Sequence, residues 1–228
     1  MNIIPYLQMC ANEGGISLQR GMNFGIRGSY SIVLMSVAKN APYADEMLED
    51  GIIKYEGHDA DRGVAKELKK SIDQPRQYFS GSLTQNGKFA RAAEEYKQGK
   101  RESARIKVYR KLRASVWVDM GFYHLIDSFL EHDGKRNVFK FLLKPQYEYF
   151  DPKSEERIDL SHDRRIPGDV MQEVYIRDKG KCVECGSSDN LHFDHKLPFS
   201  KGGSSKDVRN IQLLCARHNL SKSNKLIY

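Results

Sequence analysis

Four metal-binding side chains occur in two short-spaced pairs near the end of this 228-residue chain. Cys182 and Cys185 form a C-x-x-C pair, and Cys215 and His218 form a C-x-x-H pair further along. Soft thiolate and imidazole ligands in two such pairs suit a closed tetrahedral zinc site. The spacing therefore predicts a structural zinc ion, which would hold together a segment too short to build a core of its own.

Side chains suited to phosphodiester chemistry lie between and just beyond these pairs. They are Asp194, His195, Asn210 and Asn219. A carboxylate and an amide oxygen can hold a hard divalent cation such as Mg²⁺ or Mn²⁺. A neutral imidazole beside that cation can take a proton from water, and the cation stabilises charge on the phosphate. The combination favours metal-assisted hydrolysis of a phosphodiester.

The segment from about Arg177 to Lys225 resembles the HNH nuclease family. The resemblance rests on RDKGKCVECG, the DH pair, the P-x-S-x-GG loop, RNIQLLC and the final HN-x-x-K, in that order. It implies a ββα-metal fold, in which a β-hairpin carries Asp194 and His195 and a helix carries Asn219. It also implies that His195 is the general base, that Asp194 and Asn219 hold the catalytic metal, and that Asn210 orients the loop.

A plain zinc ribbon is the alternative for this segment, with His195 as an ordinary loop histidine. A ribbon needs neither a DH pair nor a GG loop, so the motif favours the nuclease. His192 alternates with Asp194 along the expected strand. We interpret His192 as a substrate-side or packing residue rather than a ligand.

The composition indicates a basic protein with room for two modest domains. The net charge is +7 and 39% of the residues are hydrophobic. No apolar run approaches membrane-spanning length, and the N-terminus lacks the features of a signal peptide. Cys10 is the one cysteine outside the zinc pattern, so we expect no disulfide framework and a cytoplasmic location. A basic chain with a phosphodiesterase motif is expected to bind nucleic acid through phosphates.

The pattern along the chain predicts an α+β protein with a front domain at 1–150, a linker at 151–168 and an HNH domain at 169–228. Asp169 is expected to cap the helix that leads into the zinc pair. The expected strands are 28–35, 51–57, the end of the basic segment 101–117, 121–126 and 137–143, and the expected helices are 61–71, 87–98 and 170–177.

An ordered series of motifs in the front half resembles the SET-and-RING-associated (SRA) family. The series is GIRGSYSIVL, DGIIKYEG, SLTQNGKFARA, WVDMGFYHLI and NVFKFLLK, from about Gly25 to Lys144. The resemblance implies a curved β-barrel that flips modified cytosine out of duplex DNA into a pocket. A flipped pyrimidine requires aromatic faces and polar groups on its pairing edge.

The resemblance implies that Tyr43 and Tyr55 stack on the base. Asp45 is the expected acceptor from the exocyclic amine, and Glu46 is its competitor. The alternative is that both tyrosines only pack within the domain. A phosphate-tracking surface is expected from the basic residues Arg101, Arg105, Lys107, Arg110, Lys111 and Arg113.

These inferences predict a modification-dependent DNA endonuclease, a restriction enzyme that reads 5-methylcytosine or 5-hydroxymethylcytosine in double-stranded DNA. One HNH site cuts one strand, so a double-strand break suggests a homodimer. Two alternatives stay open: an HNH nuclease that does not depend on modification, and a modified-DNA binding protein without catalysis. No membrane partner is expected.

Overall fold

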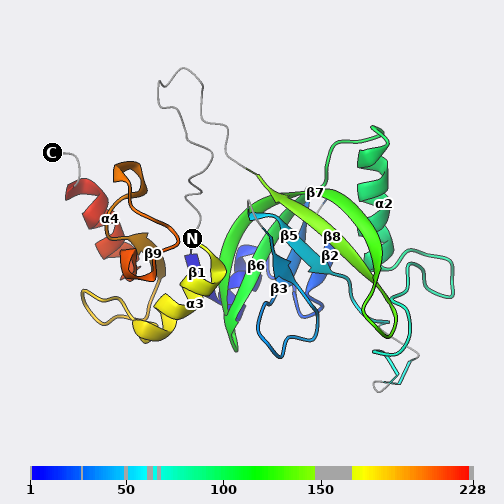
Figure 1. The fold of residues 1–228 in the computed structure, drawn as a ribbon, viewed down its shortest axis with the longest axis horizontal. Coiled ribbons are helices and arrows are strands. Elements are labelled where there is room, and N and C mark those ends of the chain that lie inside the picture. Colours follow the sequence, from blue (N-terminus) through cyan, green and yellow to red (C-terminus); the bar gives the residue numbers. More distant parts are fainter. Residues whose placement is uncertain are drawn as a thin grey trace. The chain divides into compact units, whose positions relative to one another are not determined.

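The chain divides into two compact units. Unit 1 consists of Met1–Met9, Leu112–Asp119 and Tyr147–Tyr228, and unit 2 consists of Cys10–Lys111 and Met120–Gln146 (Figure 1). The computed structural model describes residues 2–26, 28–48, 51–60, 64–65, 68–146 and 166–225. In that described part, no helix combines the length and the apolar character that spanning a bilayer requires.

Unit 2 is built on one strongly curved sheet with a helix packed against it (Figure 1). Its strands neighbour one another in the order β2-β3-β6-β7-β8-β5-β4. β3 and β6 are parallel, whereas the β2–β3, β7–β8, β5–β8 and β4–β5 pairs are antiparallel. The elements are β2 Met22–Ile26, β3 Tyr30–Met35, β4 Glu46–Met47, β5 Ile53–Glu56, α2 Gln85–Lys97, β6 Arg105–Arg113, β7 Val116–His132 and β8 Asn137–Pro145.

The α+β class is confirmed, and the expected curved sheet is present. Among the described residues the strand pairings run as an open path from β2 to β4, so these pairings do not close the sheet into a barrel. The expected single strand at the end of the basic segment is instead a hairpin. Ser115, with φ of 61°, occupies the turn between β6 and β7.

Helix α2 forms where the sequence predicts it, because its local signals agree. Thr84 caps the N-terminus by accepting a hydrogen bond from the Gly87 N–H at 3.1 Å. The alanine-rich face then packs on β2 and β8. Phe89 meets Phe24 edge-on at 5.2 Å between ring centroids and Phe141 at 5.7 Å. Burial of these rings supplies most of the helix's stability.

The predicted helix at 61–71 is wrong over the part that the structure describes. Ala65 and Leu68 accept turn hydrogen bonds from Leu68 and Ser71 at 3.0 Å, and no helix forms there. Residues 61–63 and 66–67 lie outside the described residues. Leu68 and Ile72, whose helical spacing contributed to that prediction, are 56% and 39% exposed. Without a surface to cover, the helical pattern has no packing to stabilise it.

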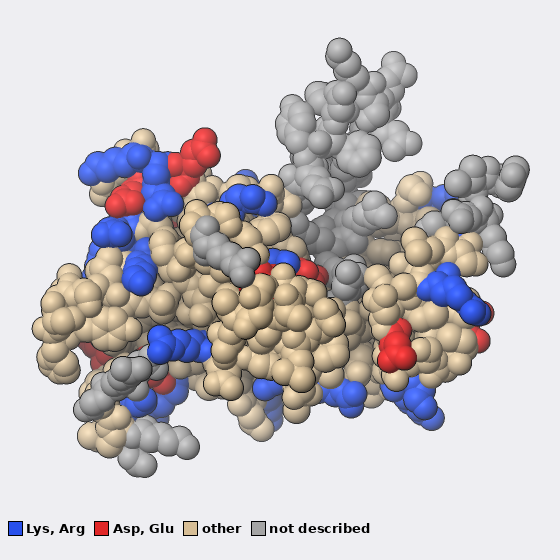
Figure 2. Space-filling model, turned by 180° about the vertical axis from the view of Figure 1, so that it is seen from behind, with Lys and Arg blue, Asp and Glu red and all other residues tan. Residues whose placement is uncertain are grey.

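The predicted phosphate-tracking surface is wrong for two of its residues. Arg110 is buried, and Lys107 forms an ion pair with the buried Glu13 at 2.8 Å. Tyr30 also donates to Glu13, at 2.5 Å. On the face drawn in Figure 2, Lys and Arg side chains are scattered, and some lie beside Asp or Glu. Alternation along β6 turns part of the basic segment inward.

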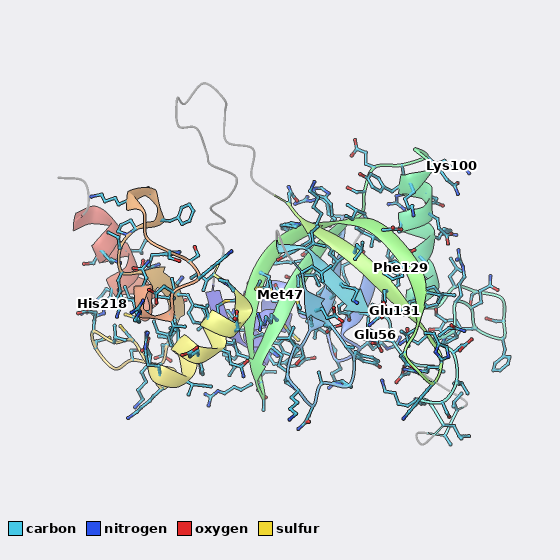
Figure 3. The ribbon with its side chains drawn as sticks, viewed as in Figure 1. Met47, Glu56, Lys100, Phe129, Glu131 and His218 are labelled. Carbon is cyan, nitrogen blue, oxygen red and sulfur yellow. The ribbon has the colours of Figure 1, made fainter. Side chains whose placement is uncertain are left out.

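A buried ion pair connects β5 to β8 in unit 2. Lys140 Nζ lies 2.9 Å from Glu56 Oε2, and the two side chains are only 2% and 6% exposed. The same pair holds the preceding loop, because Glu56 accepts from the Ala44 N–H at 3.0 Å and Lys140 donates to the Ala44 carbonyl at 3.1 Å. Glu131, labelled beside Glu56 in Figure 3, is 3.8 Å from the same ammonium.

Unit 1 places the β9–β10 hairpin beside β1. Ile3 and Val118 are paired in an antiparallel register between β1 and β7, and Asn2 is paired with His192 of β9. The elements are β1 Asn2–Pro5, α1 Tyr6–Asn12 (which continues into unit 2), α3 Gly168–Arg177, β9 Leu191–His195, η2 Phe199–Lys201, η3 Val208–Asn210, β10 Ile211–Cys215 and α4 Ala216–Lys225.

Helix α3 does not begin as expected. Pro167 occupies the N-cap position with no side-chain hydrogen bond, and Asp169 lies in the first turn, where its charge favours the helix N-terminus. At the other end, Arg177 donates to the Ile211 carbonyl at 2.8 Å, and the Leu213 N–H donates to Asp178 at 2.9 Å. These bonds tie the helix to β10.

The domain boundaries expected at 1–150, 151–168 and 169–228 stay a prediction. Residues 147–165, which contain most of the expected linker, lie outside the described residues. The described structure adds that the first nine residues and residues 112–119 cluster with the C-terminal segment.

We expect Lys140→Ala to lower the free energy of unfolding by about 3–5 kcal/mol, because it leaves the Glu56 carboxylate buried without its cation. Lys97→Ala is the matched control. Lys97 lies 2.8 Å from Asp127, but their side chains are 56% and 31% exposed, so the expected loss is below about 1 kcal/mol. Urea unfolding followed by circular dichroism measures both, and equal losses would contradict the role of the buried pair.

Candidate functional site

The four predicted zinc ligands converge in unit 1. Their ligand atoms all lie within 4.8 Å of one another. Cys185 Sγ is 3.9 Å from Cys215 Sγ, and His218 Nδ1 is 3.3 Å from Cys215 Sγ and 3.4 Å from Cys182 Sγ. A tetrahedron with Zn–S near 2.3 Å and Zn–N near 2.0 Å has edges of about 3.5–3.8 Å. The cluster could therefore hold a structural zinc ion.

Three local structures deliver these ligands. Cys182 begins a tight turn in which its N–H donates to the Ser187 carbonyl and the Gly186 N–H donates back to Cys182, each at 2.8 Å. Cys215 ends β10, and His218 follows in the first turn of α4 (labelled in Figure 3). Burial alone would raise the pKa of Cys182, but hydrogen bonds to its sulfur lower the pKa to about 6. A thiol that ionises readily suits a metal ligand.

The Asp194–His195 pair lies at the end of β9, as the hairpin prediction requires. His195 Nε2 is 2.9 Å from the hydroxyl of Ser205, which is buried. Asp194 accepts from the Gln212 amide at 3.1 Å and is paired with the Lys222 ammonium of α4. The ammonium also donates to the His195 carbonyl. The Asp194 carboxylate therefore already binds a cation, the Lys222 ammonium.

Asn210 shapes the loop that follows His195. Its side-chain oxygen accepts from the Leu197 N–H at 2.9 Å, and its amide donates to the Leu197 and Ser204 carbonyls at 3.2 and 3.0 Å. A Cβ at Gly203 would lie 1.9 Å from the Leu197 carbonyl oxygen, so only glycine allows this close approach. The geometry agrees with the loop-orienting role expected for Asn210.

Two further residues of this segment have a defined place. Asn219 follows His218 directly on α4, and α4 packs against both strands of the hairpin. His192 is half-buried on β9 opposite Leu214, and its burial lowers the pKa of the imidazole. A half-buried imidazole with a lowered pKa suits a packing role. Packing was one of the two roles that the sequence suggested for His192.

Unit 2 contains a surface cavity of about 320 Å³ that includes one of the three predicted pocket residues. Tyr43 stacks on His58 in the cavity wall, with ring centroids 4.6 Å apart and planes within 7°. The Lys70 ammonium lies 4.2 Å from the centroid of the Tyr43 ring. Because the His58 imidazole covers one face of that ring, the ammonium occupies the other face. A base can stack between two rings only when the rings are about 7 Å apart. No base therefore fits between the Tyr43 and His58 rings in this arrangement.

The other two predicted pocket residues lie behind that wall. Tyr55 is 1% exposed, and its hydroxyl donates to the Gly21 carbonyl at 3.2 Å and meets His58 Nε2 at 2.9 Å. Asp45 is buried and accepts from the backbone N–H groups of Ser36 and Glu56 at 2.9 and 3.0 Å. Neither lines the cavity. The competitor Glu46 forms an exposed ion pair with Lys54 at 3.2 Å.

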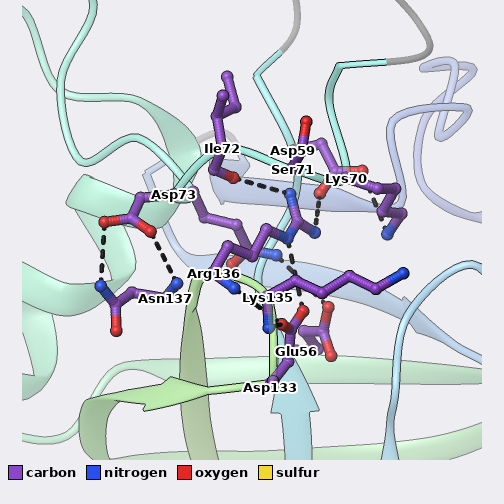
Figure 4. A network of polar contacts seen from close by, with 12 residues as sticks. Glu56, Asp59, Lys70, Ser71, Ile72, Asp73, Asp133, Lys135, Arg136 and Asn137 are labelled. Atoms are coloured by element: carbon purple, nitrogen blue, oxygen red, sulfur yellow. Dashed lines mark hydrogen bonds and ion pairs between the residues drawn. The ribbon is translucent and has the colours of Figure 1, made fainter.

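Of the lining residues of this cavity, sequence reasoning singled out Tyr43 alone, and it missed the polar residues His58, Asp59 and Asn86 among others. Asn86 clamps the His58 backbone, accepting from its N–H and donating to its carbonyl at 2.8 Å each. The Asp59 carboxylate lines the cavity and is paired with Arg136 and, at 3.2 Å, with Lys70 (Figure 4). The signal for His58 and Asp59 in the sequence was the polar HDA that directly follows KYEG, and Asn86 lies in the SLTQNG segment before helix α2.

Comparison with known proteins agrees with this division. Residues 182–225 match the family model described as HNH endonuclease. That match contains the metal cluster and the Asp194–His195 pair. No curated protein matches the chain significantly.

Solved SRA structures are similar to this chain. SUVH5 SRA with hemi-methylated CG DNA is 18% identical, with 64% of this chain and 90% of that chain covered and a TM-score of 0.42. SUVH5 SRA bound to fully hydroxymethylated CG DNA is 16% identical, with 64% and 91% covered and a TM-score of 0.40. SUVH6 of Arabidopsis thaliana is 18% identical, with 60% and 25% covered and a TM-score of 0.35. The family match is thus confined to residues 182–225, and the similarity to solved structures covers about two thirds of this chain.

We expect Cys185→Ser to release zinc, because it removes one of the four converging ligands. Cys10→Ser is the matched control, since Cys10 lies outside the cluster. Elemental analysis should find about one zinc per chain in the parent and in the control but much less in the Cys185 variant. Because binding of such a metal is coupled to folding, thermal unfolding of unit 1 should begin earlier in that variant. Full zinc content after Cys185→Ser would contradict the site.

The buried Asp45 carboxyl predicts a dependence of stability on pH. Burial raises the pKa of Asp45 to about 7, against about 3.9 in an unfolded chain. Between about pH 4 and pH 7 the folded state therefore binds more protons, so stability falls as pH rises, by at most about 1.4 kcal/mol per pH unit. Asp45→Asn should flatten this slope in urea unfolding, whereas Glu46→Gln should leave it unchanged. Equal slopes in all three proteins would refute the assignment.

Proposed function

We propose that this protein is a DNA endonuclease that reads modified cytosine and hydrolyses nearby phosphodiester bonds. One observation carries the proposal: Asp194 and His195 end one strand of a hairpin whose other strand ends in Cys215 of the four-ligand cluster, within the segment that matches the HNH endonuclease family. The charge of +7 favours a polyanionic substrate.

His195 is the proposed general base. Its imidazole is oriented by Ser205, 2.9 Å from Nε2. When Nε2 carries the hydrogen and donates it to that hydroxyl, Nδ1 is the basic nitrogen. The imidazole then takes a proton from the attacking water. Asn210 contributes by holding the loop that carries Ser204 against Leu197.

Asp194 and Asn219 are the proposed ligands of a catalytic Mg²⁺ or Mn²⁺ ion. The donor set of a carboxylate and an amide oxygen fits a hard cation, and the Lys222 ammonium on Asp194 is a cation at the same oxygen. When bound, such an ion stabilises charge on the scissile phosphate and the leaving oxygen. A zinc ion on Cys182, Cys185, Cys215 and His218 would keep α4, and with it Asn219, against the hairpin.

The cavity of unit 2 is the proposed binding site for 5-methylcytosine or 5-hydroxymethylcytosine flipped from double-stranded DNA. Tyr43 and His58 offer stacking surface, either on the outer face of the imidazole or on Tyr43 once His58 has moved aside. The Asp59 carboxylate lines the cavity and suits the exocyclic amine of cytosine. We place Asp59 ahead of Asp45 in this role, because Asp59 lines the cavity and Asp45 does not.

One HNH site cuts one strand, so we propose that a double-strand break requires two copies of the chain at one locus. The two other functions are an HNH nuclease indifferent to modification and a modified-DNA binding protein without catalysis. Each predicts a different outcome with the same substrates.

We expect cleavage of a DNA that carries 5-methylcytosine or 5-hydroxymethylcytosine but little cleavage of the same DNA without modification. Both should be tested with Mg²⁺ and with Mn²⁺ and read on gels. Substituting the general base, His195→Ala, should lower the cleavage rate by at least about a hundredfold, the range for losing acid–base catalysis. His192→Ala is the matched control and should keep most of the activity.

Equal cleavage of the 5-methylated, the 5-hydroxymethylated and the unmodified DNA would support the endonuclease activity and contradict the dependence on modified cytosine. Selective binding without cleavage by the parent protein would favour the binding protein. Unchanged cleavage by the His195 variant would reject the proposed base.

A further inference from the structure

Arg136 is a buried arginine in the hairpin that joins β7 to β8, and its side chain reaches the segment that carries Asp59 (Figure 4). The Arg136 side chain is 1% exposed, and its terminal nitrogen Nη2 lies 2.5 Å from Asp59 Oδ1. The other terminal nitrogen, Nη1, donates to the carbonyls of Lys69 and Ile72. Nε lies 3.5 Å from Asp133 Oδ2. One guanidinium therefore holds an acid that lines the cavity and also the backbone further along the same segment.

This set of contacts needs the shape of an arginine. A guanidinium presents its N–H donors in a flat, fixed fork, so a single side chain can bond a carboxylate and two carbonyls at once. A lysine ammonium is a point charge on a flexible stem and does not fix directions in this way. Burying two opposite charges costs about as much free energy as their attraction returns, so such a pair adds little stability over apolar packing. Its contribution here is the direction that it gives to the Asp59 carboxylate.

Other contacts already attach the same segment to the hairpin. Asp73 accepts from the Asn137 backbone N–H at 2.7 Å and from its side-chain amide at 3.0 Å. The Gln74 N–H donates to the Asn137 carbonyl at 3.0 Å, and Gln74 Oε1 accepts from the Phe139 N–H at 2.8 Å. Asp73 and Asn137 do not line the cavity that contains Asp59. Attachment of the segment and direction of the Asp59 side chain are thus separable.

The two carboxylate oxygens of Asp59 have different neighbours. Oδ1 is held by Arg136, whereas Oδ2 lies 3.2 Å from the Lys70 ammonium. The Lys70 side chain is 48% exposed, and an ion pair at the surface is weak because water competes for both charges. An exocyclic amine that enters the cavity can therefore replace Lys70 at Oδ2, while Arg136 keeps Oδ1 fixed.

We propose that Arg136 is a positioning residue that sets specificity for the exocyclic amine of cytosine, by holding the Asp59 carboxylate toward the cavity. This inference rests on the base-binding function proposed above. A carboxylate with a fixed direction accepts a hydrogen bond from the amine and repels the carbonyl that thymine carries at the same position. An acid that can turn away rejects thymine less strongly. Arg136 acts through Asp59, since Arg136 itself does not line the cavity.

The test compares duplexes that carry 5-methylcytosine, unmodified cytosine or thymine opposite guanine. Thymine keeps the 5-methyl group but has a carbonyl in place of the exocyclic amine. The mismatch lowers the cost of flipping thymine equally for every variant, so differences between variants report the protein. Each variant is the full chain with His195→Ala, which keeps the DNA intact, and fluorescence anisotropy gives Kd. Selectivity is Kd for the thymine duplex divided by Kd for the 5-methylcytosine duplex.

Arg136→Met should lower this selectivity about tenfold, which corresponds to about 1.4 kcal/mol and lies in the range for losing one base contact. Arg136→Lys keeps the positive charge but not the fork, so it should lower selectivity by at least about threefold. Asp73→Ala is the matched control, because it removes a contact between the same segment and the same hairpin away from the cavity. This control should retain the selectivity of the parent.

A second pair of variants separates positioning from folding. Asp59→Ala alone should remove most of the selectivity. Adding Arg136→Met to it should change selectivity by less than about twofold, because the group through which Arg136 acts is gone. Thermal unfolding followed by circular dichroism shows whether each variant is folded at the assay temperature. If Arg136→Met is unfolded there, Arg136→Lys, which leaves no buried charge unpaired, decides the result.

Three outcomes would overturn the role of Arg136. If the parent prefers 5-methylcytosine and both Arg136 variants keep its selectivity, the proposed function survives and the positioning role is wrong. Equal weakening on the 5-methylcytosine and thymine duplexes would make Arg136 a purely structural residue. A further loss of selectivity when Arg136→Met is added to Asp59→Ala would mean that Arg136 acts through another group. A parent that binds all three duplexes equally would overturn the proposed function and this inference together.

Discussion

The convergence of four metal ligands is the constraint on which unit 1 depends. Cys182 and Cys185 come from the turn after α3, Cys215 ends β10 and His218 begins α4. A metal ion on these ligands would join the three places and fix how the helix approaches the hairpin, where Lys222 is paired with Asp194. It would give a unit with such short elements the rigidity that a larger apolar core would otherwise provide. Asn219 follows His218 on the helix that packs against the hairpin.

Buried charge has the corresponding role in unit 2. Asp45 accepts two backbone hydrogen bonds, and Glu56 with Lys140 holds the Ala44 backbone from both sides. Ser36 precedes Tyr43 in the chain, and Ala44 and Asp45 follow it. Their contacts therefore hold the segment that places the Tyr43 ring against His58. Burying each carboxylate costs free energy, because its charge loses hydration that a cation or hydrogen bonds must replace.

Patterns that depend on local chemistry were readable from the sequence. The zinc spacing, the DH pair and the capped, alanine-rich helix α2 all follow from residues close together in the chain. The failures have a common cause. The pattern at 61–71 had helical periodicity but no surface to cover, and Asp169 lost the cap position to Pro167 because the helix begins earlier. Arg110 is buried because it shares a strand face with Ile106 and Val108, and Lys107 on the other face is drawn to the buried Glu13.

The sequence by itself determined which four Cys and His residues cluster, where the Asp194–His195 pair lies and the α+β class, because spacing and residue chemistry suffice for these. Only the tertiary structure decided which acid faces the cavity. Asp45 and Asp59 are close in sequence, yet the first turns toward backbone N–H groups and the second toward the cavity and Arg136. That choice depends on β8, more than seventy residues away, because side-chain direction follows from which distant strand a segment pairs with.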